Sequence, residues 1–150
     1  MKKQSAGLLL FRNISGDTEY LLVHFGGPFW KNKDEGAWSI PKGENEPGEE
    51  MLATAIREFR EETGFDPNSD FIALKPIRQK SGKMVHAWAL EQDIDAEKVR
   101  SNEIVITTKR GTEIRVPEVD RAAWFNFAGA KKRMLKEQFA FIEELHSMGK

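Results

Sequence analysis

The 150-residue sequence contains no cysteine. This absence excludes disulfide bonds, thiolate metal sites and cysteine nucleophiles. Long apolar runs are also missing: the apolar stretch 6–11 ends at Arg12, which is too short for a signal peptide or for a membrane-spanning helix of about 20 residues. We therefore expect a cytoplasmic protein that does not bind membranes.

Neither sign of charge is in marked excess. The 23 Lys and Arg residues against 24 Asp and Glu residues leave a net charge of −1, so the total charge gives no general attraction to nucleic acid. A hydrophobic content of 39% and a charged content of 31% are typical of a globular protein. We expect one domain over residues 1–150, and we do not expect a nucleic acid partner.

Short apolar runs separated by turn residues predict a sheet-rich fold. Residues 6–11 and 20–25 predict an antiparallel hairpin, because Ser15-Gly16-Asp17 supplies a turn between them. Further strands are expected at 37–41, 71–78, 84–90, 103–116 (a hairpin) and 122–127.

Two helical regions accompany these strands. Over 48–63, Leu52, Ala55, Ile56 and Phe59 recur at helical spacing with acids in the first turn, and Gly64 follows as a C-cap. A C-terminal helical region has apolar residues at 135, 139, 142 and 145. The sequence predicts an α/β fold with helices on either side of the sheet.

The segment from Glu44 to Glu62 carries seven glutamates against two arginines, a net charge of −5. Glu58, Glu61 and Glu62 fall at helical spacing, so we expect them on one side of the helix, opposite the stripe Leu52-Ile56-Phe59. Each pair of like charges costs a helix about 0.2–0.5 kcal/mol, which a divalent cation would offset. Carboxylates without cysteine or histidine favour Mg²⁺ or Mn²⁺, although a solvated acidic helix face is the simpler alternative.

The spacing of this segment is more specific than its charge. Gly43 is followed after five residues by Glu49, and after seven more by Arg57-Glu58-Phe59-Arg60-Glu61-Glu62-Thr63-Gly64-Phe65. The segment resembles the signature of the Nudix hydrolases at every fixed position. The resemblance implies an α/β/α sandwich with a mixed central sheet. It also implies metal-dependent hydrolysis of a nucleoside diphosphate linked to another group.

The resemblance also implies roles for individual residues. Glu58, Glu61 and Glu62 correspond to metal ligands, joined by the carbonyl of Gly43, and Glu49 and Arg57 correspond to a supporting pair. A further carboxylate often precedes a late strand in the family, and here Glu118 is the first candidate and Asp120 the second. The general base is either Glu118 or Glu61.

Substrate contacts are expected from basic and aromatic residues outside the signature. Lys42 precedes Gly43, and the acid-free stretch 71–90 contains Arg78 and Lys83, which could hold phosphate oxygens or belong to an ordinary exposed hairpin. The aromatic residues Trp38, Trp30 and Phe29 could stack on a nucleobase, with core packing as the alternative for Trp38.

The resemblance leaves the substrate open. Dinucleoside polyphosphates and nucleoside triphosphates are the first expectation, with nucleotide sugars and 5′-capped RNA as alternatives. A nucleotide-sensing module without catalysis is the alternative from another class. Such a module predicts the loss of one or more signature glutamates, and this sequence contains all of them.

Overall fold

The computed structural model describes residues 3–150. The strands are β1 (Gln4–Ile14), β2 (Asp17–Phe25), β3 (Trp38–Ser39), β4 (Lys42–Glu44), β5 (Ile72–Ala73), β6 (Ile77–Arg78), β7 (Met84–Glu91), β8 (Glu103–Thr107), β9 (Glu113–Pro117) and β10 (Val119–Phe125). The helices are α1 (Met51–Thr63), α2 (Phe127–Arg133) and α3 (Phe139–Ser147), with 3-10 turns η1 (Ala96–Lys98) and η2 (Lys136–Gln138).

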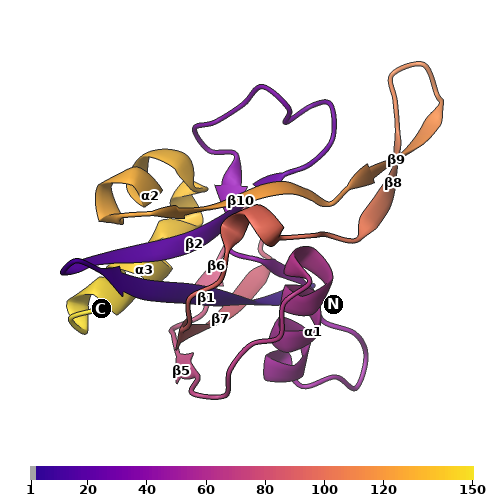
Figure 1. The fold of residues 1–150 in the computed structure, drawn as a ribbon. Coiled ribbons are helices and arrows are strands. Elements are labelled where there is room, and N and C mark those ends of the chain that lie inside the picture. Colours follow the sequence, from indigo (N-terminus) through magenta and orange to yellow (C-terminus); the bar gives the residue numbers. More distant parts are fainter. Residues whose placement is uncertain (1–2) are drawn as a thin grey trace.

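One mixed sheet forms the centre of the molecule (Figure 1). Its main strands run in the order β10-β2-β1-β7-β5, and the short strands β3, β4 and β6 pair with β2, β1 and β7. The β1–β7 pair is parallel and the other pairs are antiparallel. Strands β8 and β9 form a separate two-stranded sheet that extends away from the body as an arm, defined here as residues 103–117.

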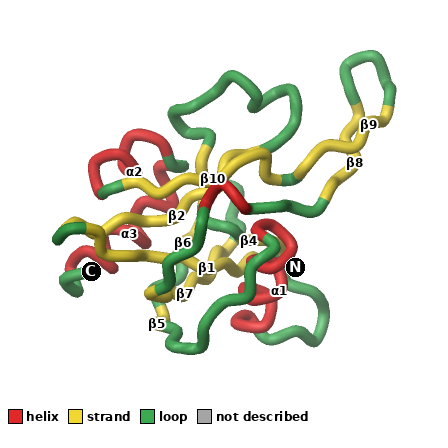
Figure 2. The backbone as a smooth tube through the Cα atoms, in the orientation of Figure 1, coloured by secondary structure: helices red, strands yellow, loops and turns green. Residues whose placement is uncertain are grey.

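The side chains of β1 alternate between two cores, one on each face of the sheet. Leu8 and Leu10 pack with Phe59 of α1, whereas Leu9 and Phe11 pack with the core that includes Ile142 of α3. Helix α1 therefore covers one face, and α2 and α3 cover the other (Figure 2). This arrangement confirms the predicted α/β/α sandwich.

Helix α1 differs from its prediction in two ways. It begins at Met51, so the expected acids precede its first turn rather than occupy it. Its buried face contains Glu58 and Glu62, whereas Leu52 and Ile56 of the expected apolar stripe are only half-buried. The predicted C-cap is confirmed, because Gly64 adopts φ 78° and donates its N–H to the carbonyl of Arg60.

Most other elements lie close to their predicted positions. Both hairpins are confirmed, but the predicted strand 71–78 is interrupted between β5 and β6, where Pro76 has no N–H to donate. The last strand begins at Val119 rather than 122 and ends at Phe125, because Asn126 caps α2 by accepting a hydrogen bond from the N–H of Gly129. The C-terminal helical region is divided after Arg133 into α2, η2 and α3. Across residues 3–150, none of the helices has the length and apolar character needed to cross a membrane.

Candidate functional site

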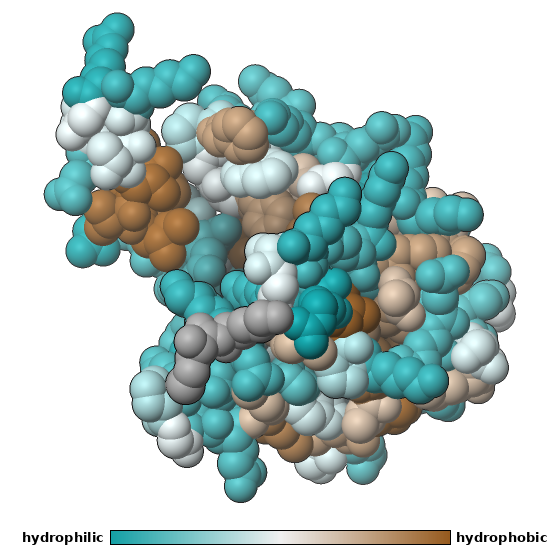
Figure 3. Space-filling model, turned by 180° about the vertical axis from the view of Figure 1, so that it is seen from behind, coloured by the Kyte–Doolittle hydropathy of each residue, from teal (hydrophilic) through white to brown (hydrophobic). Residues whose placement is uncertain are grey.

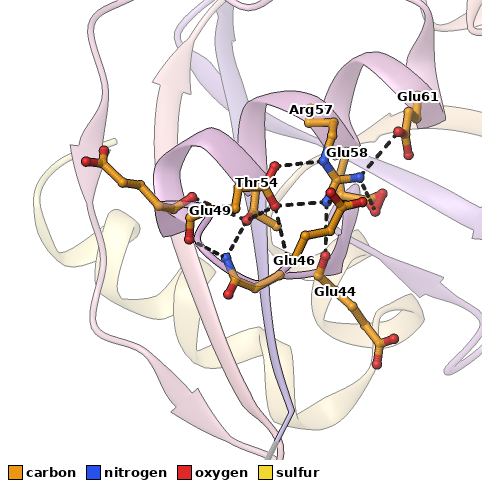
Figure 4. Close-up of polar contacts among 9 residues, drawn as sticks. Glu44, Glu46, Glu49, Thr54, Arg57, Glu58 and Glu61 are labelled. Atoms are coloured by element: carbon orange, nitrogen blue, oxygen red, sulfur yellow. Dashed lines mark hydrogen bonds and ion pairs between the residues drawn. The ribbon is translucent and has the colours of Figure 1, made fainter.

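Arg57 is the centre of a hydrogen-bonded network on α1 (Figure 4). Its guanidinium contacts both carboxylate oxygens of Glu49, with Nε 2.8 Å and Nη2 3.1 Å from them. Its Nη1 lies 3.3 Å from one oxygen of Glu58 and 3.3 Å from one oxygen of Glu61. Nη2 also donates to the backbone carbonyl of Glu44. One arginine thus holds three signature glutamates and connects α1 to β4.

Glu49 supports this network from the loop before α1. Hydrogen bonds from Arg57, and next from the hydroxyl of Thr54, lower the pKa of Glu49 to about 2. The same contacts raise the pKa of Arg57, with its hydrogen bonds to Glu49 as the largest cause. The fork geometry of a guanidinium fixes the direction of each bond as well as its strength. The structure therefore brings Glu49 and Arg57 together as the pair that the signature implies.

Glu58 lies between α1 and β4 in an environment that disfavours its charge. Burial, and next the proximity of Glu61, raise the pKa of its carboxyl to about 7. Its Oε2 atom is buried and has no hydrogen-bond partner among residues 3–150. A Cβ atom at position 43 would overlap this carboxylate, so only glycine allows the backbone of β4 to approach it. Glu58 and Gly43 are therefore in direct proximity, as the metal site would require.

Glu62, Glu118 and Lys42 line a small cavity of about 80 Å³ beside Glu58. Burial and then the charge of Glu118 raise the pKa of Glu62 well above its ordinary value. Burial, and next the charge of Lys83, lower the pKa of Lys42. Three elements distant in sequence thus place two carboxylates and one ammonium group around the same space.

Backbone hydrogen bonds position Glu118 next to α1. The N–H of Asn102 donates to the carbonyl of Glu61 at 2.8 Å, and the N–H of Glu118 donates to the carbonyl of Asn102 at 3.0 Å. The carbonyl of Glu118 accepts a further bond from Gly26 at 3.0 Å. Asn102 therefore connects the C-terminal turn of α1 to the root of the arm, and no side-chain pattern in the sequence reveals this connection.

Asp120, the second candidate for the external carboxylate, faces a different partner. Its Oδ1 lies 2.8 Å from Nδ1 of the buried His24, whose Nε2 lies 2.6 Å from the carbonyl oxygen of Lys33. Because both partners offer acceptor oxygens, this imidazole fastens the loop 26–36 to β10. Asp120 is engaged in that link, and Glu118 is the carboxylate that lies against Glu62.

The candidate substrate residues are placed unequally. Lys83 is 3.9 Å from Glu44 at the edge of the site, whereas Arg78 is exposed on β6 and takes no part in these contacts. Trp38 is only 4% exposed and packs edge-on against His24 and Phe125, so its expected role in base stacking is wrong for this structure. Trp30 remains partly exposed and contacts Phe25 and Phe29.

The segment that leads into the site is held by a residue that the sequence does not single out. The carbonyl oxygen of the buried Gln138 side chain accepts hydrogen bonds from the N–H of Ile40 and the hydroxyl of Ser39, both at 3.1 Å. These bonds fix the chain just before Lys42. An isolated glutamine near the C-terminus carries no motif that would identify this role.

The donor set is suitable for a hard divalent cation. Within residues 3–150, no group of three or more side chains is already arranged as a metal site, and Glu61 is turned toward Arg57. Two observations nevertheless fit a bound cation. Oε2 of Glu58 has no hydrogen-bond partner among the described residues, and the backbone of Gly43 lies close to the same carboxylate. Oxygen ligands of this kind are preferred by Mg²⁺ and Mn²⁺.

Comparison with known sequences gives a consistent result. The family model described as the NUDIX domain matches residues 1–145. The chain is 40% identical over 111 residues to the asymmetrical bis(5′-nucleosyl)-tetraphosphatase of Rattus norvegicus, covering 65% of this chain and 71% of that protein. It is 46% identical over 50 residues to nucleoside diphosphate-linked moiety X motif 6 of Xenopus laevis, covering 33% of this chain. The chain spans only 22% of the length of that Xenopus protein.

Solved structures share the fold over nearly the whole chain. A binary complex of a C. elegans Ap4A hydrolase aligns with a TM-score of 0.69 and 22% identity, covering 96% of each chain. The NUDIX domain of Shewanella oneidensis NrtR, complexed with ADP ribose, aligns with a TM-score of 0.68 and 16% identity, covering 100% of this chain and 90% of that one. At these identities the likeness establishes the fold.

Proposed function

The chain belongs to the Nudix family, and from this premise we propose that it hydrolyses a phosphoric anhydride bond in a nucleoside diphosphate linked to another group. The observation that carries the proposal is the convergence of Glu62 and Glu118 with Lys42 around one cavity, with Glu58 close enough for its charge to help raise the pKa of Glu62. These acids are held together although their charges repel, which costs stability and therefore requires a functional reason.

A divalent cation accounts for this arrangement. Mg²⁺ or Mn²⁺ would be held by Glu58, Glu61, Glu62, Glu118 and the carbonyl of Gly43. When bound, it would neutralise phosphate charge and lower the pKa of a coordinated water.

The chain's own residues supply the remaining functions. The ammonium group of Lys42 faces the same cavity as Glu62 and is positioned to contact phosphate oxygens. Lys83, at the edge of the site, would extend this positive charge along a polyphosphate. Arg57 and Glu49 orient the glutamates, while Glu118 or Glu61 accepts the proton of the attacking water.

The substrate that we propose is a dinucleoside polyphosphate or a nucleoside triphosphate. Support comes from the similarity to the rat bis(5′-nucleosyl)-tetraphosphatase, which covers 71% of that protein. Nucleotide sugars and capped RNA have no specific observation in their favour. The net charge of −1 gives no general attraction to RNA.

The decisive experiment is hydrolysis of a substrate panel with Mg²⁺, scored by kcat/KM and with the products identified. The panel contains diadenosine tetraphosphate, nucleoside triphosphates, ADP-ribose and a capped RNA. We expect Glu62→Gln to lower kcat/KM about 100-fold or more, because it removes charge that the cation needs. The matched control is Glu50→Gln, an exposed acid whose side chain makes no hydrogen bond at the start of the same helix. Absence of Mg²⁺-stimulated turnover across the panel would refute the proposal.

A further inference from the structure

The arm has one apolar face that the rest of the chain covers only in part. Directly opposite residues of β8 and β9 point to the same face, and two of these pairs are Ile104–Val116 and Ile106–Ile114. Ile104 is 37% exposed, and the other three are half-buried. A two-stranded sheet is marginally stable by itself, so its apolar face gains stability by being covered.

The loop 26–36 lies opposite this face and leaves a groove between them. The groove has a volume of about 560 Å³ and is lined by Pro28, Phe29, Ile106, Thr107, Thr108 and Lys109. Figure 3 shows apolar side chains on the arm beside a hollow that separates the arm from the body. Gly27, at φ 97°, brings the loop backbone close to Ile106 and Val116, so loop and arm are in contact at one end of the groove.

Phe29 is the exposed aromatic wall of this groove. Its side chain is 66% exposed, although Trp30 contacts its ring at 4.9 Å between centroids. Lys33 places its ammonium group 3.6 Å from the ring centroid. The groove is lined by no acid and by one lysine, Lys109, so its surroundings favour an anionic ligand with a flat apolar part.

The groove and the carboxylate cluster are joined through the chain. Glu118 directly follows the arm, and its carbonyl accepts a hydrogen bond from Gly26 at the start of the loop. The cavity beside Glu118, at about 80 Å³, is far smaller than the 300 Å³ or more of ordinary ligand pockets. A nucleotide whose phosphates lie at this cavity must therefore place its nucleoside outside it.

We propose that the groove between Phe29 and the apolar face of the arm is the nucleobase subsite of this protein. The base stacks on Phe29 and packs against Ile106, and Thr107, Thr108 and Lys109 provide polar contacts at the rim. This inference rests on the proposed function and adds the residues that recognise the base.

Two disruptive substitutions, one conservative variant and one matched control test the subsite. Phe29→Ala removes the aromatic wall at an exposed position, and Ile106→Thr makes the apolar face of the arm more polar. Phe29→Trp keeps an aromatic surface. Val105→Thr changes the neighbouring β-branched residue, which points to the opposite face of the arm and is 52% exposed.

The probes are diadenosine tetraphosphate, ATP and ribose 5-triphosphate, in which a hydroxyl replaces the base. We expect Phe29→Ala and Ile106→Thr to raise KM for the two nucleotides roughly 5- to 100-fold, the effect of losing one stacked base. Turnover of ribose 5-triphosphate should change by less than about twofold, because it has no base. Val105→Thr should match the wild type on all three probes, and Phe29→Trp should reverse most of the rise in KM that Phe29→Ala causes for the two nucleotides.

The outcomes separate this inference from the proposed function. If the wild type hydrolyses none of the three probes, the proposed substrate class is wrong and the subsite is refuted with it. If it hydrolyses the nucleotides and Phe29→Ala and Ile106→Thr do so with unchanged KM, the subsite is refuted while the function stands. If the wild type is a dimer that Ile106→Thr dissociates, with equal loss of turnover on all probes, the arm binds a second copy and the subsite is also refuted.

Discussion

The substitution Glu58→Gln should stabilise the metal-free protein while removing its activity. Oε2 of Glu58 is buried without a hydrogen-bond partner in the described part of the chain, and burial raises the pKa of this carboxyl to about 7. At about pH 8 the folded chain therefore holds a buried charge that the unfolded chain leaves in water. A glutamine of the same shape removes that charge and can still accept the hydrogen bond from Arg57.

The size of the effect follows from the cost of a buried unsatisfied group, about 1–3 kcal/mol. Part of this gain is lost, because the amide of glutamine accepts a weaker hydrogen bond from Arg57 than the carboxylate, whose bond is 3.3 Å long. A net gain of about 1–2 kcal/mol corresponds to a rise in Tm of roughly 2–8 °C for a chain of this length.

The sign of the pH dependence can be stated as well. Because the folded pKa lies above the ordinary value of 4.5, ionisation of Glu58 weakens the fold as pH rises from about 4.5 to 7. The advantage of Glu58→Gln should therefore grow across this range and disappear below it. Glu50→Gln, which changes an exposed acid, should show no such trend.

The assay is thermal unfolding in a chelator and then in excess Mg²⁺. Mg²⁺ should raise the Tm of the wild type, since a ligand at 100 times its dissociation constant adds about 2.7 kcal/mol, and should raise that of Glu58→Gln far less. A variant less stable than the wild type in chelator would show that the native fold satisfies this carboxylate. A wild-type Tm that does not respond to Mg²⁺ would refute the metal site itself.

Three further predictions concern the support of the site. Arg57→Lys should lower kcat/KM about 10- to 100-fold, because lysine cannot form the two-pronged contact with Glu49, and steady-state kinetics will show whether it does. Gly43→Ala should abolish the Mg²⁺-induced rise in Tm, since its Cβ displaces the Glu58 carboxylate; a normal rise would contradict the close approach. The pKa of Glu49 is lowered to about 2, so its charge stabilises the fold above pH 4.5 and this stabilisation is lost as pH falls toward 2. The free energy of unfolding of Glu49→Gln, measured by denaturant titration, should therefore depend less on pH over that range than that of the wild type.

The parts of the site that the sequence predicts lie on one continuous segment. Helical spacing and the signature were enough to bring Glu49, Arg57 and Glu58 together, because their relative positions depend on a single loop and helix. The hairpins were predictable for a similar reason, since their turn residues are local. In both cases the positions of the side chains depend on residues that are close in sequence.

The remaining features depend on contacts between distant segments. Glu118 reaches α1 through the backbone of Asn102, which carries no side-chain signal. Trp38 is buried, and its ring packs against those of His24 and Phe125. The sequence around an aromatic residue does not distinguish a buried ring from one that is exposed to a ligand. Helical spacing also predicts the glutamates of α1 on the side opposite its apolar stripe, whereas Glu58 and Glu62 lie on the buried side of the helix.

Glu118 lines the same cavity as Glu62 and directly follows the arm, so under the proposed function it connects the base subsite to the metal site. Two backbone hydrogen bonds hold this residue at the point where arm and body meet: its N–H donates to the carbonyl of Asn102, and its carbonyl accepts from the N–H of Gly26. Glu62 and Glu118 already line one cavity without a ligand. Under the proposed function, a base bound between Phe29 and the arm therefore holds the polyphosphate beside carboxylates that are already in place, and its binding energy lowers KM. Under the proposed function, this connection explains why a two-stranded arm, which is marginally stable by itself, is attached directly to Glu118.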